Sequence, residues 1–318
     1  MRVAFLGLGT MGVPMATRLV QGGHAVHGFD NLPAARERLA SIGGTPCDSA
    51  VAAAADADAV ITMLPDERIV ESVLFGEEGA VRAIAPGALF LDMGTSGAQW
   101  IHVCAQRLAS TNVRVMDAPV ARGVREAAAG ELLVMVGGDA ADMAAAMPLL
   151  NCFARPEDLI HVGPLGSAIR LKLINNYLSL VNMVVAAEGL TFAALAGVPR
   201  ETALRVLGAT PAGKGQLLTN FPLKVLRGDV TPDFPLRLGL KDLSLALNLG
   251  ARLGAPLHLG AAARQAFSLA NRWGRAEEDC TAMLLLLEDL CRLPHAQSVA
   301  DFFDPAGISP ATTEGENS

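Results

Sequence analysis

The sequence predicts an α/β fold: an N-terminal Rossmann-type doubly wound sheet, followed by an all-α C-terminal domain that a long helix joins to it. Three observations carry this prediction. Short apolar runs alternate with helix-like segments over the first half of the chain, as in βαβ units. From Ser167 to Ala196 one apolar stretch without proline predicts a single long helix, and no strand-like alternation follows it. Half of all residues are hydrophobic but only 4% are aromatic, so small aliphatic side chains must fill the core.

Six segments of the first half are predicted as strands because they are short, apolar and bounded by turn residues. In chain order they are Arg2–Leu6, Ala25–Asp30, Ala59–Leu64, Ala88–Asp92, Arg114–Asp117 and Leu132–Val136. The predicted covering helices between them are Met11–Gln21, Ala34–Ser41, Ala50–Ala57, Ile69–Leu74 and Gly97–Leu108. We therefore expect residues 1–163 to form the first domain and 164–295 the helical substrate and dimerisation domain. Residues 296–318, which end in a stretch rich in Gly, Pro, Thr and Glu, are expected to form a flexible tail.

Composition narrows the class of protein. A length of 318 residues suits two domains. The net charge of −7 leaves no basic excess to neutralise phosphates, which argues against a nucleic-acid partner. The five cysteines are scattered, which indicates free thiols in a reducing compartment. No apolar stretch of about 18 residues is free of charges and turn signals, so no membrane span is expected. The chain is therefore predicted to be cytoplasmic.

A glycine-rich segment follows the first predicted strand. Gly7, Gly9 and Gly12 form a G-x-G-x-x-G pattern with Thr10 and Met11 inside it, and a helix is predicted next. The first glycine permits a tight turn, the second lets the backbone approach a pyrophosphate, and the third lets helix and strand pack closely. The helix N-terminus adds amide donors for the phosphates. These five residues are predicted to bind a dinucleotide; the alternative is a glycine-rich turn without a ligand.

Asp30 ends the second predicted strand, about 20 residues beyond the loop, where an acid accepts hydrogen bonds from the adenosine ribose and repels a 2′-phosphate. Asn31 follows it, and the nearest arginine, Arg36, is predicted on the next helix. The pattern favours NAD over NADP as cofactor. The alternative for Asp30 is a helix N-cap.

Lys172 is the first candidate for catalysis. It lies in the long apolar helix, where an unpaired ammonium is costly, so its charge or its pKa is expected to have a use. Desolvation lowers a lysine pKa toward neutrality, where the group both donates and accepts protons. Asn176 lies one turn further on the same face and is placed to hold a substrate oxygen. The alternative is a snorkelling lysine with asparagines in capping roles.

Four landmarks occur in order along the chain: the loop Gly7–Gly12, the motif Asp117–Gly123, the run Gly163–Asn176, and Leu240–Leu243. Together they resemble the β-hydroxyacid dehydrogenases, a family that includes 3-hydroxyisobutyrate dehydrogenase, tartronate semialdehyde reductase and, more remotely, 6-phosphogluconate dehydrogenase. The resemblance runs from Gly7 to about Leu290. It implies reversible hydride transfer between NAD and a small acidic hydroxy compound.

The resemblance also implies roles for individual residues. It implies that Lys172 protonates the carbonyl oxygen as hydride arrives, or removes the hydroxyl proton in reverse, and that Asn175 lines the substrate site. It places Leu64 and Pro65 beneath the cofactor and Thr95 near the nicotinamide ribose. Lys241 would reach the cofactor from the helical domain, and the alternative for this lysine is an ion pair with Asp242 or Glu288.

One motif departs from the family pattern. Most members have Ser-Gly-Gly where this chain has Ala121, Arg122 and Gly123, so a hydroxyl is missing and a guanidinium is added. This departure resembles a subgroup that reduces sulfolactaldehyde. That subgroup shares the arginine, with Gly-Arg at this place, but has a hydroxyl residue where Gly123 stands. By that resemblance Arg122 holds a sulfonate. The substrate pocket would be lined by Arg122 and Gly123 together with Asn175, Asn176, Tyr177, Leu178 and Ser179. The alternative is an Arg122 that points to solvent or pairs with Glu126.

The predicted function is therefore the reversible NAD-dependent reduction of a short semialdehyde acid, with 3-sulfolactaldehyde as the first candidate substrate. 3-Hydroxyisobutyrate, tartronate semialdehyde and 4-hydroxybutyrate are the alternatives with the same chemistry. A non-catalytic dinucleotide-binding module or an imine reductase is disfavoured because Lys172 is retained. The six histidines have no ligand spacing, so no metal is predicted. The apolar helical half is expected to form a homodimer or homotetramer.

Overall fold

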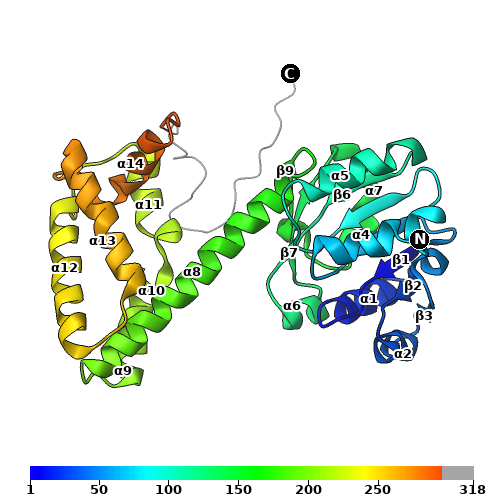
Figure 1. The fold of residues 1–318 in the computed structure, drawn as a ribbon, viewed down its shortest axis with the longest axis horizontal. Helices are drawn as coiled ribbons and strands as arrows, with labels where there is room; N and C mark the ends of the chain where they lie inside the picture. Colours follow the sequence, from blue (N-terminus) through cyan, green and yellow to red (C-terminus); the bar gives the residue numbers. More distant parts are fainter. Residues whose placement is uncertain (296–318) are drawn as a thin grey trace. The chain divides into compact units, whose positions relative to one another are not determined.

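The computed structural model describes residues 1–295, in two compact units: Met1–Leu178 and the chain from Ser179 onward (Figure 1). The first holds a Rossmann-type sheet and the second is helical, which confirms the predicted fold class. The division falls inside the long helix α8 (Ser167–Leu195), whose bounds match the predicted helix to one residue. The predicted domain boundary after residue 163 stays a prediction, and the predicted tail 296–318 lies outside the described residues.

The sheet of the first unit contains all six predicted strands, each within two residues of its expected ends, and three more that were not predicted. In the sheet order β3-β2-β1-β4-β5-β6-β8-β7, β9 pairs with β8. The bounds are β1 (Arg2–Leu6), β2 (Ala25–Phe29), β3 (Thr45–Pro46), β4 (Ala59–Thr62), β5 (Leu89–Asp92), β6 (Arg114–Asp117), β7 (Val120–Ala121), β8 (Leu133–Gly137) and β9 (Leu159–Gly163).

The sheet is parallel from β3 through β6, but β8 runs antiparallel to both β6 and β7. The strand itself was predicted, but its antiparallel direction was not. β7 follows β6 after only two residues and continues in its direction, so β8 pairs with both strands in the same antiparallel sense. Two-residue strands such as β3 and β7 are too short to show an alternating pattern in the sequence.

Alternate side chains of each strand enter two separate cores. Val3 and Phe5 of β1 face one core, and Ala4 and Leu6 face the other; all four are fully buried. Helices cover both faces, as the doubly wound prediction requires (Figure 1). One face is covered by α1 (Gly12–Gln21), α2 (Pro33–Ser41), α6 (Val124–Ala129) and α7 (Ala140–Leu150), and the other by α3 (Ala50–Ala54), α4 (Glu67–Phe75) and α5 (Trp100–Leu108).

The second unit begins within α8, and as far as residue 295 its regular elements are all helices. Its longer helices are α9 (Arg200–Ala209), α12 (Leu236–Leu253), α13 (His258–Ala270) and α14 (Met283–Leu290), and its short ones are α10 (Pro211–Lys214) and α11 (Asn220–Leu223). A small core of Leu236, Ala270, Ala282 and Leu286 holds the last three long helices together.

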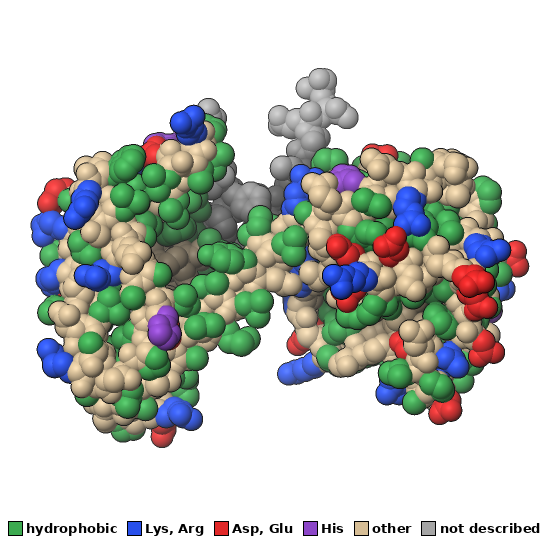
Figure 2. Space-filling model, in the orientation of Figure 1, with side chains coloured by type: hydrophobic (Ala, Val, Ile, Leu, Met, Phe, Trp, Pro, Cys, Tyr) green, Lys and Arg blue, Asp and Glu red, His purple; other side chains and the backbone are tan. Residues whose placement is uncertain are grey.

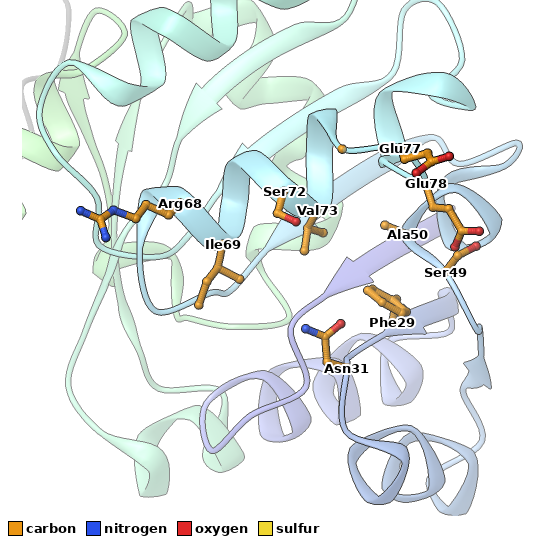
Figure 3. Close-up of a pocket in the computed structure, with 11 residues that line it drawn as sticks. Phe29, Asn31, Ser49, Ala50, Arg68, Ile69, Ser72, Val73, Glu77 and Glu78 are labelled. Carbon is orange, nitrogen blue, oxygen red and sulfur yellow. The ribbon is translucent and has the colours of Figure 1, made fainter.

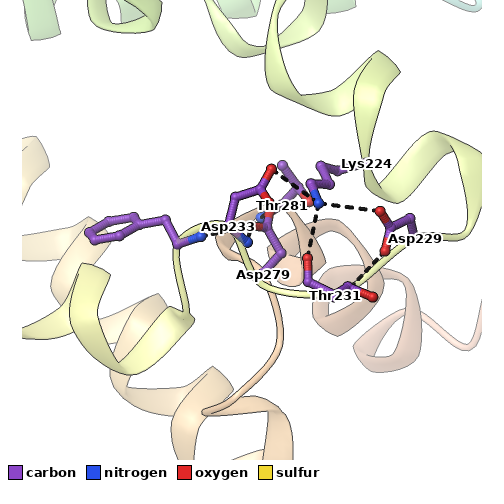
Figure 4. Close-up of polar contacts among 7 residues, drawn as sticks. Lys224, Asp229, Thr231, Asp233, Asp279 and Thr281 are labelled. Atoms are coloured by element: carbon purple, nitrogen blue, oxygen red, sulfur yellow. Dashed lines mark hydrogen bonds and ion pairs between the residues drawn. The ribbon is translucent and has the colours of Figure 1, made fainter.

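A polar cluster closes the loop before α12. The Lys224 ammonium, whose side chain is 14% exposed, lies 3.2 Å from Asp229 and 3.1 Å from Asp233 (Figure 4). The buried Asp279 carboxylate accepts hydrogen bonds from the backbone N–H of Phe234 and from Thr281. Through these hydrogen bonds and ion pairs, the segment 224–235 is joined to Asp279, which precedes the short helix Cys280–Ala282.

One helix, α8, is long and apolar enough to cross a membrane by length and composition. This differs from the expectation that no apolar stretch of about 18 residues is free of charges and turn signals. The first turn of α8 is packed in the core of the first unit, where Ala168 and Ile169 are buried. A single helix that meets this test is weak evidence for a membrane span.

Candidate active site

The glycine loop is built as its sequence requires. Gly7 has φ +103°, and a Cβ atom there would collide with the carbonyl oxygen of Met63, just beyond β4. A Cβ atom at Gly12 would collide with the carbonyl oxygen of Gly7, so α1 begins in direct contact with the turn. By contrast, a Cβ atom at Gly9 would meet nothing within 4 Å. The loop is thus closed on the protein side and open over the N-terminus of α1, the geometry that fits a pyrophosphate.

Asp30 connects the glycine loop to the end of β2. Its Oδ2 accepts a hydrogen bond of 2.8 Å from the Leu8 N–H, and its Oδ1 accepts one of 2.9 Å from the Leu32 N–H. The N-cap of α2 is Leu32 rather than Asp30, so Asp30 is not the helix cap that was the alternative interpretation. Its carboxylate borders a cavity instead.

Four of the predicted cofactor residues line this one cavity of about 190 Å³. They are Gly7, Asp30, Leu64 and Pro65. A neighbouring cavity of about 340 Å³ extends it between the end of β2 and helix α4. Together the two form a trough along the carboxyl edge of β1, β2 and β4, where open α/β sheets bind their ligands.

Several residues of the trough were not predicted from the sequence. Both cavities share Phe29, Asn31, Ile69 and Val73. Figure 3 shows Phe29 and Asn31 at the end of β2, with Ile69, Ser72 and Val73 of α4 on the opposite side. Two signals were present in the sequence: Phe29 and Asn31 flank Asp30, and Ile69 and Val73 lie one turn apart on a helix next to Pro65.

Thr95 lies in the loop between β5 and α5 and is half-buried. The neighbouring Gly94 packs against Leu64, since a Cβ atom at Gly94 would lie 2.7 Å from the Leu64 carbonyl oxygen. The loop of Thr95 and the segment Leu64–Pro65 therefore lie close together.

The predicted substrate residues of α8 are arranged along two turns. Lys172 and Asn176 are half-buried, whereas the residues between them are exposed. Burial holds the pKa of Lys172 below its usual range. The Asn175 side-chain amide donates to Asn176 Oδ1 at 3.3 Å, while Tyr177 is 66% exposed. Leu178 is exposed as well, and Ser179 falls in the second unit. The helix thus gives Lys172 and Asn176 a common, partly desolvated face.

Arg122 occupies a strained position, with φ +75° in a residue other than glycine. Its guanidinium donates to both carboxylate oxygens of Asp158, at 2.6 and 2.8 Å, and to the carbonyl oxygen of Glu131 at 2.6 Å. The hydrogen bonds to Asp158 raise the pKa of Arg122. The expected alternative partner, Glu126, instead accepts the Gly123 N–H at 2.9 Å. The guanidinium carries more N–H donors than these three bonds use.

Lys241 lies on α12 in the helical unit, where its ammonium is 2.8 Å from Asp242 and both side chains are more than half exposed. An exposed pair of this kind contributes little to stability. Its predicted reach toward the cofactor remains a prediction.

A Rossmann sheet with this glycine loop and an acid at the end of β2, followed by a helical domain, defines a nicotinamide-dinucleotide-dependent oxidoreductase. Two family models match the chain: the NAD binding domain of 6-phosphogluconate dehydrogenase over residues 2–163, and the NAD-binding domain of NADP-dependent 3-hydroxyisobutyrate dehydrogenase over residues 166–287. The chain belongs to the 3-hydroxyisobutyrate dehydrogenase family of NAD-dependent β-hydroxyacid dehydrogenases.

Two relatives are named for activities that fit this family. The chain is 39% identical to the 3-sulfolactaldehyde reductase of Escherichia coli over 282 residues, which is 89% of this chain and 94% of that protein. It is 31% identical to the 2-(hydroxymethyl)glutarate dehydrogenase of Eubacterium barkeri over 91% of this chain and 95% of that protein.

Solved structures show the same architecture. The 3-hydroxyisobutyrate dehydrogenase of Mycobacterium tuberculosis, solved with L-serine, has a TM-score of 0.62 at 33% identity, covering 90% of this chain and 98% of that one. An imine reductase from Myxococcus stipitatus, solved with NADP⁺, has a TM-score of 0.81 at 17% identity, covering 90% of this chain and all of that one. At that identity the likeness concerns the fold alone.

Replacing Asp30 tests the cofactor trough. In Asp30→Ser the charge that repels a 2′-phosphate is lost and the shorter side chain no longer reaches the ribose, so the dissociation constant of NADH should rise about 10- to 100-fold. The preference for NADH over NADPH should shrink by at least the same factor. Fluorescence titration with each cofactor measures this. Asp30→Asn keeps one acceptor oxygen and serves as the matched control; equal affinity of all three proteins for NADH would contradict the assignment.

Proposed function

We propose that the protein interconverts a short hydroxy acid and its semialdehyde with NAD(H), and that 3-sulfolactaldehyde is the preferred carbonyl substrate. The observation that carries this proposal is the partly desolvated face of Lys172 and Asn176, in the same unit as the glycine loop and Asp30. The choice of sulfonate over carboxylate is supported by Arg122 and by the relative named for 3-sulfolactaldehyde.

Lys172 is the proposed acid and base. A bound NADH supplies hydride to the carbonyl carbon from nicotinamide C4. As charge develops on the carbonyl oxygen, the Lys172 ammonium donates a proton to it; in reverse, neutral Lys172 removes the proton of the hydroxyl. Burial brings the pKa of Lys172 down toward the range in which both forms are populated.

Asn176 is the proposed hydrogen-bond partner of the substrate oxygen, and Asn175 is proposed to line the substrate site beside it. Asn176 shares the face of Lys172, one turn further along α8, so its amide can donate to the oxygen that Lys172 protonates. The hydrogen bond from Asn175 to Asn176 Oδ1 directs the Asn176 amide nitrogen away from its neighbour. Tyr177, Leu178 and Ser179 complete the proposed lining on the exposed side.

Arg122 and Gly123 are the proposed anion site. The ion pair with Asp158 fixes the plane of the guanidinium, and the donors not used by Asp158 and Glu131 remain for an oxyanion of the substrate. Binding energy from this distant group orients the carbonyl carbon for hydride transfer. A sulfonate offers three oxygens to a guanidinium, whereas a carboxylate offers two.

The residues that would hold the dinucleotide lie in the first unit, with one exception. Gly7, Gly9, Thr10, Met11 and Gly12 would bind the pyrophosphate. Asp30 would bind the adenosine ribose, Leu64 and Pro65 would lie beneath the cofactor, and Thr95 would contact the nicotinamide ribose. From the helical unit, Lys241 is proposed to bind the cofactor.

Carboxylated substrates form the second candidate. Relatives of this chain are named for L-threonate and L-serine, and a probable 3-hydroxyisobutyrate dehydrogenase of Mycobacterium tuberculosis is 35% identical. Tartronate semialdehyde and 4-hydroxybutyrate fit the same chemistry. Gly123 favours this candidate, because the hydroxyl side chain of the sulfolactaldehyde-reducing subgroup is missing there.

The protein is further proposed to be a cytoplasmic homodimer or homotetramer. Apolar side chains of α8 are strongly exposed, among them Ile174 at 56%, Leu180 at 61% and Met183 at 64% (Figure 2). Exposed apolar surface of this extent indicates an interface with another protein surface. Sedimentation of the intact chain should give the mass of two or four copies, and a monomer at micromolar concentration would contradict the proposal.

Replacing Lys172 tests the mechanism. Lys172→Ala should lower kcat by about 100-fold or more, with the NADH dissociation constant unchanged, because proton transfer rather than cofactor binding is lost. In the wild type, kcat for carbonyl reduction should fall as pH rises through the Lys172 pKa, because reduction needs the protonated form. For alcohol oxidation kcat should rise over the same range. Unchanged turnover in Lys172→Ala would overturn the assignment.

Replacing Arg122 tests the anion site. NADH oxidation is measured with a panel of short semialdehyde acids, sulfonated and carboxylated. Wild type should prefer 3-sulfolactaldehyde, and Arg122→Ala should raise its KM about 10- to 100-fold with a smaller change in kcat. Arg125→Ala removes an exposed arginine three residues away and should match wild type. A carboxylated preference in wild type would replace the sulfonate assignment and leave the reaction class intact.

A further inference from the structure

Two buried carboxylates lie side by side at the carboxyl edge of the sheet. Asp92 ends β5 and Asp117 ends β6, and the two residues are direct partners in the parallel register. Asp92 is 3% exposed and Asp117 is 2% exposed. Adjacent carboxylates away from water are costly unless several donors stabilise each of them. Burial is the main cause that raises the pKa of Asp92, and the charge of Asp117 raises it further.

Asp92 holds the loop that carries Thr95. Its Oδ1 accepts hydrogen bonds from the Thr62 hydroxyl at 2.9 Å and from the Gly94 N–H at 3.3 Å. Its Oδ2 accepts the Ser96 hydroxyl at 3.4 Å. Thr62 belongs to β4, so one carboxylate joins the loop after β5 to the neighbouring strand.

Asp117 holds the start of α8. Its Oδ1 accepts the Gly166 N–H and its Oδ2 accepts the Ile169 N–H, both at 2.8 Å. These N–H groups belong to the first turn of the helix, where they have no partner within the helix and where its dipole favours a negative charge. The position opposite Asp117 on β8 is Gly137, and a Cβ atom there would collide with the Asp117 carboxylate. The sheet leaves room for this side chain.

Lys172 follows Ile169 by one turn of the same rigid helix, so the position of its ammonium depends on where Asp117 holds the first turn. Thr95 lies in the loop that Asp92 holds, on the next strand. Neighbouring strands are about 4.8 Å apart, which sets a short and fixed separation between the two anchored segments. The register pair thus links the proposed cofactor loop and the proposed catalytic helix through one sheet edge.

We propose that Asp92 and Asp117 act as paired positioning residues: Asp92 sets the loop that meets the nicotinamide ribose, and Asp117 sets the helix that carries Lys172. The expected effect of these residues on turnover rests on the proposed function. Its structural part, the anchoring of the two segments, does not depend on the identity of the substrate.

The kinetic test compares Asp117→Ala, Asp117→Asn and Asp92→Ala with wild type. Asp117→Ala should lower kcat about 100-fold, since displacement of a catalytic group by about 1 Å has an effect of that size. Its NADH dissociation constant should not change, and the deuterium isotope effect on kcat with NADH labelled at C4 should rise. Asp117→Asn keeps one acceptor and should recover part of kcat. Asp92→Ala should instead weaken NADH binding about tenfold.

Asp279→Asn is the matched control. Asp279 is buried to a similar degree, at 4% exposed, and accepts backbone N–H groups at the start of a short helix in the other unit. Its replacement should lower thermal stability without altering the isotope effect or the kcat of the folded enzyme. If the Asp117 variants behave like this control, with stability lost and the kinetics of the folded enzyme kept, the positioning role is overturned.

Amide hydrogen exchange separates this inference from the proposed function. In Asp117→Ala the N–H groups of Gly166 and Ile169 should exchange about 10- to 100-fold faster, with the Gly94 N–H unchanged; Asp92→Ala should give the reverse pattern. If the wild-type protein reduces no short semialdehyde acid, the proposed function is overturned. The exchange rates of the variants would still test the anchoring, because they do not depend on turnover. Unchanged exchange at all three sites would overturn the anchoring.

Discussion

The carboxylate of Asp117 fixes the first turn of α8 to the end of β6, and the proposed chemistry depends on this contact. In the first unit, α8 is held by the burial of Ala168 and Ile169 and by hydrogen bonds to Asp117. Two short hydrogen bonds from Gly166 and Ile169 determine where the helix starts, and the helical geometry then determines where Lys172 lies. Proton transfer needs its donor within hydrogen-bond distance of the substrate oxygen, so the proposed role of Lys172 requires this anchor.

The same edge of the sheet supplies the cofactor trough, because the carboxyl ends of parallel strands meet there. The glycine loop after β1, Asp30 after β2 and Pro65 after β4 each come from a different strand end. We propose that substrate choice depends on a different segment, the one after β7 that contains Arg122. Under this proposal a substitution in that segment changes the anion that is recognised and leaves the hydride and proton transfers in place.

The fold was largely predictable from the sequence, since alternation of strands and helices and one long apolar helix are local patterns. The loop Gly7–Gly12 and Asp30 were predictable for the same reason. The antiparallel strand β8 was not, because its direction depends on a pairing across the sheet. Asp158 was also missed as the partner of Arg122: 36 residues separate them, and only the pairing of β8 with β9 places them together. The role of Asp117 depends in the same way on contacts far apart in sequence.

The central claim is that Lys172 moves the proton of the substrate oxygen while Asn176 and Arg122 hold the substrate at its two ends. A crystal structure of the protein with NAD⁺ and 3-sulfolactate tests it most directly. In that structure we expect the substrate hydroxyl within about 3 Å of Lys172 Nζ, with its carbon facing nicotinamide C4 and its sulfonate on Arg122. A bound substrate whose hydroxyl is held by other side chains, with Lys172 out of reach, would contradict it.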